Sequence, residues 1–189
     1  MDSTSLLHWR QDIDKSGMNI LSMGIFYEAL MRWVGPASSV TAITNIFVKQ
    51  RKEAESGKTI PIQIPDHVDI IAEMACGAQA RMQFSSVLGL VSPKAEISLF
   101  GSEGTLKLDL ESGQLFIGKK GEDKMTLYEI PASDQQHWRV EEEFVSAIRG
   151  NEKISLTTFE DGVKYMEFTE AVWRSSIQKK TIALPLNVQ

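Results

Sequence analysis

Residues 66–87 carry the pattern that most restricts the fold, two alternations of apolar and polar side chains separated by Cys76-Gly77. Every second residue in each half is apolar, and these positions are Val68, Ile70, Ala72, Met74, Ala80, Met82 and Phe84. Because successive side chains of a strand point to opposite faces, the two halves predict a β-hairpin with one apolar and one polar face. This division is typical of an antiparallel sheet that covers a core on one side.

Further extended segments, rich in β-branched and aromatic residues, predict a larger sheet around this hairpin. Residues 38–50 precede it and carry apolar side chains on both faces, including Ile43 and Phe47, which indicates cover on both sides. The other expected strands are residues 95–100, 105–110, 114–118, 125–130 and 181–186. Glycine-containing turns separate the strands that follow the hairpin.

A long apolar helix is expected at residues 18–34, which contain no proline and end at Gly35-Pro36. Ser16 is the expected N-cap of this helix. Apolar side chains cover nearly the whole circumference, so the pattern predicts a buried helix. Its first two turns also carry Asn19 and Ser22, small polar residues suited either to a ligand site or to a capped helix end.

Two more helices are expected near the C-terminal end of the chain. Capping-box matches at residues 133–136 and 157–160 predict helices that run through Arg149 and to about Lys179. The order of elements is a helix, many strands, two helices and a strand. It predicts an α+β fold with helices on one face of a mostly antiparallel sheet.

Length and composition restrict the number of domains and the classes of partner. The 189 residues suit one domain, which we place at residues 9–189 after a disordered or artificial lead-in at residues 1–8. A net charge of −5 with scattered basic residues argues against a nucleic-acid or membrane partner. One cysteine, Cys76, fits a reducing compartment, and no apolar run approaches the roughly 18 residues of a membrane span. We therefore expect a cytoplasmic protein.

Candidate metal-ligating and nucleophilic residues are few. His8, His67 and His137 lie in separate segments without ligand spacing, and one cysteine cannot form a thiolate site, so no metal site is expected. The chain contains neither a Gly-x-Ser-x-Gly elbow nor a G-x-G-x-x-G fingerprint. We therefore expect no dinucleotide-binding site within this chain.

Several stretches carry a combined pattern of order and spacing from Trp9 to Leu186. They are Trp9-Arg10, Ser16-Gly17, Met23-Gly24-Ile25, residues 99–106, residues 143–150, residues 158–162, Ala171-Val172 and Ser175-Ser176. Together they resemble the C-terminal domain of the Gfo/Idh/MocA oxidoreductases, whose namesakes are glucose–fructose oxidoreductase and inositol dehydrogenase.

The resemblance implies a large open sheet with helices packed on one face, used for substrate contact and subunit association. In this family the domain follows an N-terminal Rossmann domain that binds NAD or NADP. That domain is absent from this chain, as is the Glu-Lys-Pro motif whose lysine serves the catalytic site. We therefore expect the cofactor in the full-length protein and none in this chain. The implied substrates are sugars, polyols or related small polar molecules.

The helix that carries catalysis in this family departs from the family pattern here. It typically reads Asp-x-Gly-x-His, whereas this chain has Ser22 in place of the aspartate and Phe26 in place of the histidine. Neither side chain can act as a general base near neutral pH. We therefore assign no catalytic residue, and an active full-length protein would need atypical catalytic residues.

The residues expected to line a substrate site are Arg10, Asn19, Ser22, Phe26 and Tyr27. Arg10 would hold an oxygen or a carboxylate, Asn19 and Ser22 would exchange hydrogen bonds, and Phe26 would form a wall near the nicotinamide. Helix-end capping is the alternative role for Asn19 and Ser22, and a surface ion pair with a neighbouring aspartate is the alternative for Arg10.

The expected function is that of the substrate-binding and oligomerisation domain of an NAD(P)-dependent oxidoreductase, inactive as an isolated chain. Its partners would be the N-terminal Rossmann domain, a small polar substrate and a second copy of the chain. The polar hairpin face is either solvated or the contact with that copy, and it carries Asp69, Glu73, Gln79, Arg81 and Gln83. The alternative is a stand-alone, non-catalytic binding or scaffold module derived from the family.

Overall fold

A computed structural model describes residues 4–92, 94–135, 138–155 and 157–187. The chain divides into two compact units, a first unit of Met1–Leu88 with Ile154–Gln189 and a second unit of Gly89–Lys153. Each unit combines antiparallel strands with helical segments. No helix in the described part of the chain is long and apolar enough to span a membrane.

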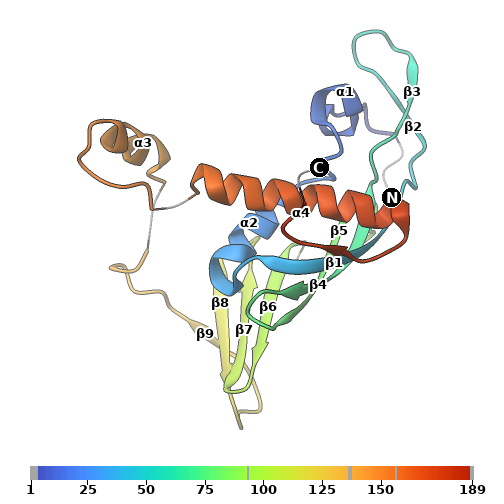
Figure 1. The fold of residues 1–189 in the computed structure, drawn as a ribbon. Helices are drawn as coiled ribbons and strands as arrows, with labels where there is room; N and C mark the ends of the chain where they lie inside the picture. Colours follow the sequence, from blue (N-terminus) through green and yellow to red (C-terminus); the bar gives the residue numbers. More distant parts are fainter. Residues whose placement is uncertain (1–3, 93, 136–137, 156, 188–189) are drawn as a thin grey trace. The chain divides into compact units, whose positions relative to one another are not determined.

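A four-stranded antiparallel sheet forms the centre of the first unit, with the strand order β10-β1-β4-β5 (Figure 1). Its strands are β1 Ala37–Asn45, β4 His67–Met74, β5 Gln79–Ser85 and β10 Ile182–Ala183. The β4–β5 pair confirms the predicted hairpin, because Ile70 lies opposite Met82 and the apolar residues of β4 are buried. Gly77 in the turn adopts a φ of +88°, which favours glycine.

A second, two-stranded sheet pairs β2 Gln50–Lys52 with β3 Thr59–Pro61. The strand expected at residues 38–50 is therefore two strands, since β1 ends at Asn45. The interruption has a clear cause. The buried carboxylate of Asp66 accepts hydrogen bonds from the backbone N–H groups of Phe47 and Val48 at 2.9 and 2.8 Å, which takes both amides out of a strand ladder.

The long apolar helix, α2, spans Met23–Val34 and begins later than the expected residue 18. The chain before it forms two short elements, η1 Trp9–Gln11 and α1 Ile13–Ser16. Asp12 caps α1 through the backbone N–H of Asp14, and Gly17 ends it with a φ of +58°. Ser16 is thus the last residue of α1, and its expected role as the cap of the long helix is wrong.

Helices α2 and α4, the latter spanning Phe159–Gln178, pack on the apolar face of the four-stranded sheet. Tyr27 of α2 and Phe168 of α4 stack with their ring centroids 3.6 Å apart. The Tyr27 hydroxyl accepts a hydrogen bond from the backbone N–H of Ala37 at 2.8 Å, so the ring packs in the core and its polar end is satisfied. The opposite face of the sheet is largely exposed.

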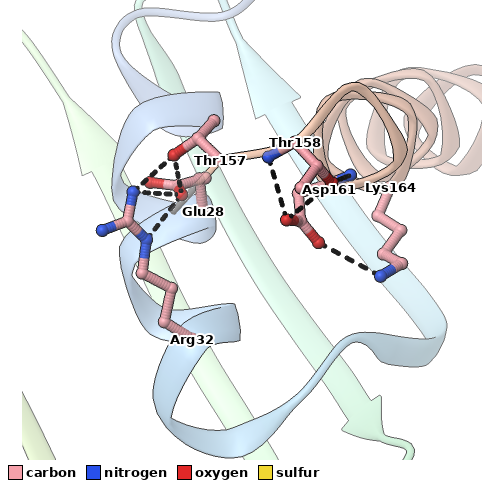
Figure 2. Close-up of polar contacts among 6 residues, drawn as sticks. All are labelled: Glu28, Arg32, Thr157, Thr158, Asp161 and Lys164. Atoms are coloured by element: carbon pink, nitrogen blue, oxygen red, sulfur yellow. Dashed lines mark hydrogen bonds and ion pairs between the residues drawn. The ribbon is translucent and has the colours of Figure 1, made fainter. Parts of the chain in front are cut away.

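The start of α4 is held by a capping box that also meets α2 (Figure 2). Thr158 Oγ1 accepts from the backbone N–H of Asp161 at 3.2 Å, and the Asp161 carboxylate accepts from the backbone N–H of Thr158 at 3.1 Å. The box lies one residue later than the expected match at 157–160. Thr157 instead donates to Glu28 Oε1 at 2.9 Å and accepts from Arg32 Nη2 at 2.6 Å, which ties this end of α4 to α2.

The second unit contains a four-stranded antiparallel sheet in sequential order. Its strands are β6 Glu96–Gly101, β7 Gly104–Asp109, β8 Gln114–Lys119 and β9 Thr126–Tyr128. Gly104 is required at its turn, because a Cβ there would lie 2.3 Å from the carbonyl oxygen of Gly118.

Helix α3, Val140–Ile148, also belongs to the second unit and begins later than the expected residue 133. Ser133 does not cap a helix, since its hydroxyl donates to the Asp134 carboxylate at 2.9 Å. Gln136 and His137 lie outside the described residues. The expected α+β class with antiparallel strands and helices packed on a sheet is confirmed, and hydrogen bonds distribute the described strands over three sheets.

Candidate functional site

The Arg10 pocket, a cavity of about 220 Å³ in the first unit, is the strongest candidate for a ligand site. It is lined by His8, Arg10, Gln11, Leu21, Ser22, Ile64, Pro65, Asp66 and Ser86. These residues come from η1, from the turn before α2, from the connector before β4 and from the end of β5. Apolar wall residues and polar groups from distant segments thus meet at one place, as in small-molecule sites.

Reciprocal capping holds η1 in position beside the pocket. His8 Nδ1 accepts a hydrogen bond from the backbone N–H of Arg10 at 3.2 Å, and the backbone N–H of His8 donates to Gln11 Oε1 at 3.0 Å. The Arg10 guanidinium lies over the ring of Trp9, with its central carbon 4.2 Å from the ring centroid. Backbone and ring contacts together orient the cation.

The chain leading into η1 is anchored to the two-stranded sheet. The backbone N–H of Leu7 donates to the carbonyl of Lys52 at 2.8 Å. The buried side chain of Arg51 donates from Nη1 to the carbonyl of Ser5 at 3.0 Å and also contacts the Ser5 hydroxyl. The chain just before η1 is therefore held against β2.

The opposite wall of the pocket comes from the two ends of the β4–β5 hairpin. Asp66 is only 3% exposed, and its backbone carbonyl accepts from the backbone N–H of Ser86 at 3.0 Å. Because its carboxylate already accepts two backbone N–H groups, Asp66 closes the wall as a structural anchor. Ile64 and Pro65 add an apolar surface beside it.

Two of the five expected substrate-site residues, Arg10 and Ser22, lie together in the Arg10 pocket. Neither of their alternative roles is formed in the described residues, since Arg10 makes no ion pair with Asp12 or Asp14 and the Ser22 side chain caps no backbone N–H. Asp12 instead pairs with Lys15 at 3.2 Å, and that hydrogen bond is the main cause that lowers the pKa of Asp12.

The other three expected residues lie outside the pocket lining. Asn19 is half-buried, and its Oδ1 has no hydrogen-bond partner among the described residues. Phe26 packs beside Phe84 of β5, with ring centroids 6.0 Å apart. Tyr27 is 1% exposed in the core, and this burial raises the pKa of its hydroxyl, which therefore stays protonated near neutral pH.

Residues that the sequence reasoning missed include His8, Gln11, Asp66 and Ser86. The spacing of a side-chain acceptor at His8 and a glutamine three residues later is a local capping signal that could have been found. Asp66 and Ser86 flank the predicted hairpin, so its register would have placed them opposite each other. No local sequence pattern predicts that Asp66 and Ser86 lie beside η1.

The described residues contain no group of three histidine, cysteine, aspartate or glutamate side chains that could hold a metal ion. His137 is outside them. The closely spaced glycines, Gly101 with Gly104 and Gly118 with Gly121, lie in or beside strands of the four-stranded sheet of the second unit, where no helix follows to bind a pyrophosphate. These glycines therefore do not form the strand–turn–helix arrangement that holds a pyrophosphate.

The outer face of the four-stranded sheet combines a polar cluster with two exposed isoleucines. Asp69 accepts from Gln83 Nε2 at 2.8 Å and lies 3.0 Å from His67 Nε2, and these hydrogen bonds lower its pKa. Ile43 and Ile71 are 63% and 64% exposed on neighbouring strands. A mixed surface of this kind suits either solvent or a protein contact.

The chain was compared with known protein families and solved structures. The family described as the GFO/IDH/MocA C-terminal domain matches residues 2–107. No curated protein sequence matches the chain. An oxidoreductase domain protein from Kribbella flavida is similar in structure, with a TM-score of 0.79, 20% identity, and coverage of 98% of this chain and 56% of that one.

Two further solved structures extend the comparison. Levoglucosan dehydrogenase in complex with NADH and levoglucosan has a TM-score of 0.77 and 18% identity, covering 98% of this chain and 55% of that chain. A super-repressor mutant of Gal80p from Saccharomyces cerevisiae has a TM-score of 0.66 and 14% identity, covering 89% and 50%.

The chain thus spans about half the length of these similar structures, and their low identities establish likeness of fold. The family match supports membership in the family as well as the fold, because the matched residues 2–107 are more than half of the 189 residues. The sheet, the two packed helices and this match lead to one assignment. The chain belongs to the Gfo/Idh/MocA C-terminal domain family.

Proposed function

We propose that this chain is the substrate-binding and self-associating domain of an NAD(P)-dependent oxidoreductase that acts on a sugar, a polyol or a similar small polar molecule. The observation that carries the proposal is the Arg10 pocket, which joins Arg10 and Ser22 to an apolar wall at the start of α2. The resemblance to the Gfo/Idh/MocA oxidoreductases implies that α2 is the helix on which that family carries its catalytic motif.

Within that pocket, each lining residue has a simple binding role. The Arg10 guanidinium donates hydrogen bonds to a ligand oxygen, and the Ser22 hydroxyl donates or accepts one. Leu21 and Ile64 contact the carbon skeleton and exclude water from one side. Together these groups bind and orient a polyhydroxylated ligand.

The nicotinamide cofactor would supply or accept the hydride when bound. We place its binding in an N-terminal Rossmann domain of the same protein, because the closely spaced glycines among the described residues form no strand–turn–helix arrangement that holds a pyrophosphate. Levoglucosan dehydrogenase, similar in fold over this chain, is known in complex with NADH and with L-sorbose or levoglucosan. That similarity supports the proposed cofactor and substrate class.

Self-association would use the outer face of the four-stranded sheet. Ile43 and Ile71 are diagonal neighbours there, since Ile43 pairs with Asp69 and Ile71 pairs with Thr41. A second copy would remove both exposed isoleucines from water, while the surrounding polar groups would form a hydrogen-bonded rim. A contact between identical faces is the ordinary arrangement of a two-fold homodimer.

The experiment that tests substrate binding is an NMR titration of the uniformly ¹⁵N-labelled chain with sugars and polyols, including levoglucosan and L-sorbose. The expected result is a saturable set of amide shifts confined to residues 8–11, 21–22, 64, 66 and 86. A Ser22→Val variant should weaken the response, and Ser112→Val, on an exposed turn, serves as the control. Shifts absent from these residues for every compound would contradict the proposal.

A second candidate is a non-catalytic binding or scaffold module. It is favoured by Phe26, whose ring packs beside Phe84 where the family pattern has a histidine. The chain is also similar in fold to Gal80p, whose structure was solved as a super-repressor mutant, and this likeness is consistent with the second candidate. Turnover by the full-length protein on any compound that binds the pocket would exclude this candidate.

A further inference from the structure

Three polar side chains that line the Arg10 pocket, those of His8, Gln11 and Asp66, have their acceptor atoms engaged within the protein. His8 Nδ1 accepts from the backbone N–H of Arg10, and Gln11 Oε1 accepts from that of His8. The two carboxylate oxygens of Asp66 accept from the backbone N–H groups of residues 47–48. A ligand that enters the pocket therefore meets few free acceptors.

Four donors in the same lining are not engaged, whereas the Ser86 hydroxyl donates to the carbonyl of Asp66 at 3.5 Å. Because His8 Nδ1 is an acceptor, the neutral imidazole carries its proton on Nε2, which is left as a donor. The amide Nε2 of Gln11, the Arg10 guanidinium and the Ser22 hydroxyl also have no hydrogen-bond acceptor among the described residues. The pocket is thus rich in donors and carries a permanent cation.

We propose that the Arg10 pocket binds the carboxylate group of its ligand, and that Arg10 and His8 are the residues that select it. This inference rests on the proposed function, since it names the chemical class of the substrate: a small sugar acid or other polyhydroxylated carboxylate. The guanidinium offers two parallel N–H groups to the two carboxylate oxygens, and the His8 Nε2–H adds a third donor.

Charge and size favour a carboxylate over a phosphate. The lining contains one arginine and also the Asp66 carboxylate, so its formal charges balance before a ligand enters. In this balanced lining, a bound monoanion leaves one uncompensated negative charge, whereas a dianionic phosphate leaves two. The cavity of about 220 Å³ is smaller than the roughly 300–1,000 Å³ of ordinary small-molecule sites, which suits a compact ligand.

The test compares matched probes on the full 189-residue chain by NMR titration. The probes are D-glucuronate, its neutral amide D-glucuronamide, D-glucose and inorganic phosphate. We expect glucuronate to bind about tenfold more tightly than glucuronamide, the lower range for hydrogen bonds to a charged group. Added salt should weaken glucuronate binding more than glucose binding.

Three variants locate the selectivity. Arg10→Gln should remove the preference for glucuronate over glucuronamide, and it should weaken glucuronate binding more than glucose binding. His8→Asn keeps a side-chain acceptor for the backbone N–H of Arg10 but lacks the distal donor, so it should reduce glucuronate binding without unfolding η1. Arg81→Gln, an exposed arginine on β5, is the control and should change nothing.

The outcomes separate this inference from the proposed function. Neutral sugars that bind the pocket residues as tightly as glucuronate would support the proposed function and overturn the carboxylate assignment. Tighter binding of phosphate than of glucuronate would also overturn it. If no probe shifts the amide signals of residues 8–11, 21–22, 64, 66 or 86, both proposals fail. Unchanged preference in Arg10→Gln, with its fold confirmed by the amide spectrum, would overturn the role of Arg10.

Discussion

Removal of the hydroxyl of Ser175 is expected to destabilise the first unit strongly. This side chain is fully buried in α4, where its Oγ accepts from the backbone N–H of Ala42 at 2.9 Å and donates to the carbonyl of Lys180 at 2.7 Å. Ala42 lies beyond Ser39 and Val40, the two residues of β1 that β10 pairs. Ser175 therefore replaces the missing strand partner of Ala42.

The magnitude follows from one buried and one partly exposed backbone group that would lose their partner. The buried N–H of Ala42 costs about 1–3 kcal/mol when left unsatisfied, and the lost hydrogen bond to the carbonyl of the exposed Lys180 costs about 0.5–1.5 kcal/mol. The better helix propensity of alanine returns about 0.5 kcal/mol. Ser175→Ala should thus lower the free energy of unfolding by about 1–4 kcal/mol. For a chain of this size, that corresponds to a decrease of roughly 2–16 °C in Tm.

The adjacent Ser176 provides the matched control. It is also buried, but its Oγ donates to the carbonyl of Trp173 within the same helix, so Ser176→Ala breaks only a local bond and leaves the backbone of other elements untouched. Urea unfolding followed by far-UV circular dichroism would measure both variants, with the m-value required to stay constant. A loss of less than about 1 kcal/mol for Ser175→Ala, or an equal loss for both, would refute the reasoning.

Three further predictions concern stability, association and chemistry. The hydrogen bond from the backbone N–H of its N-cap residue lowers the pKa of Asp161 in the fold, so its contribution to stability is complete above the unfolded pKa and is lost as pH falls through the folded one. Asp161→Asn should therefore flatten the decline of the urea midpoint below about pH 5, and an unchanged decline would contradict this. Ile71→Lys should shift the chain towards monomer in sedimentation velocity, whereas Ile25→Lys, equally exposed on α2, should not; equal effects would argue against the outer sheet face. In the full-length protein, Phe26→His with Ser22→Asp tests the altered motif on a panel of polyols and sugar acids: loss of an existing turnover would indicate a different mechanism, a gain would indicate lost catalysis, and no change would remove both positions from the site.

Much of the fold could be predicted because the signals were local. The alternation in residues 66–87 places Val68, Ile70, Ala72 and Met74 on one face, and this row is buried as expected. Helix α4 ends at Gln178, close to the expected Lys179. Both depend on side chains a few residues apart, and a single sequence contains that information.

Element starts were predicted less well, because a cap competes with neighbouring hydrogen bonds. Ser133 bonds to Asp134, and Ser16 ends the short helix that Asp12 caps, so α3 and α2 begin later than their sequence patterns indicate. The capping box of α4 is displaced by one residue because Thr157 is engaged by Glu28 and Arg32. Local motifs name candidates for a cap, and tertiary partners select among them.

The candidate site shows most clearly which features local sequence patterns predict and which depend on tertiary contacts. The sequence by itself indicated Arg10 and Ser22 as candidate substrate-site residues, and it indicated the family. Only the tertiary structure placed Tyr27 in the core and brought Asp66 and Ser86 to the wall opposite η1. The physical reason is that a pocket is a relation between segments distant along the chain. Its walls are set by strand register and by long-range anchors such as the contact of Arg51 with the chain before η1, which no local pattern encodes.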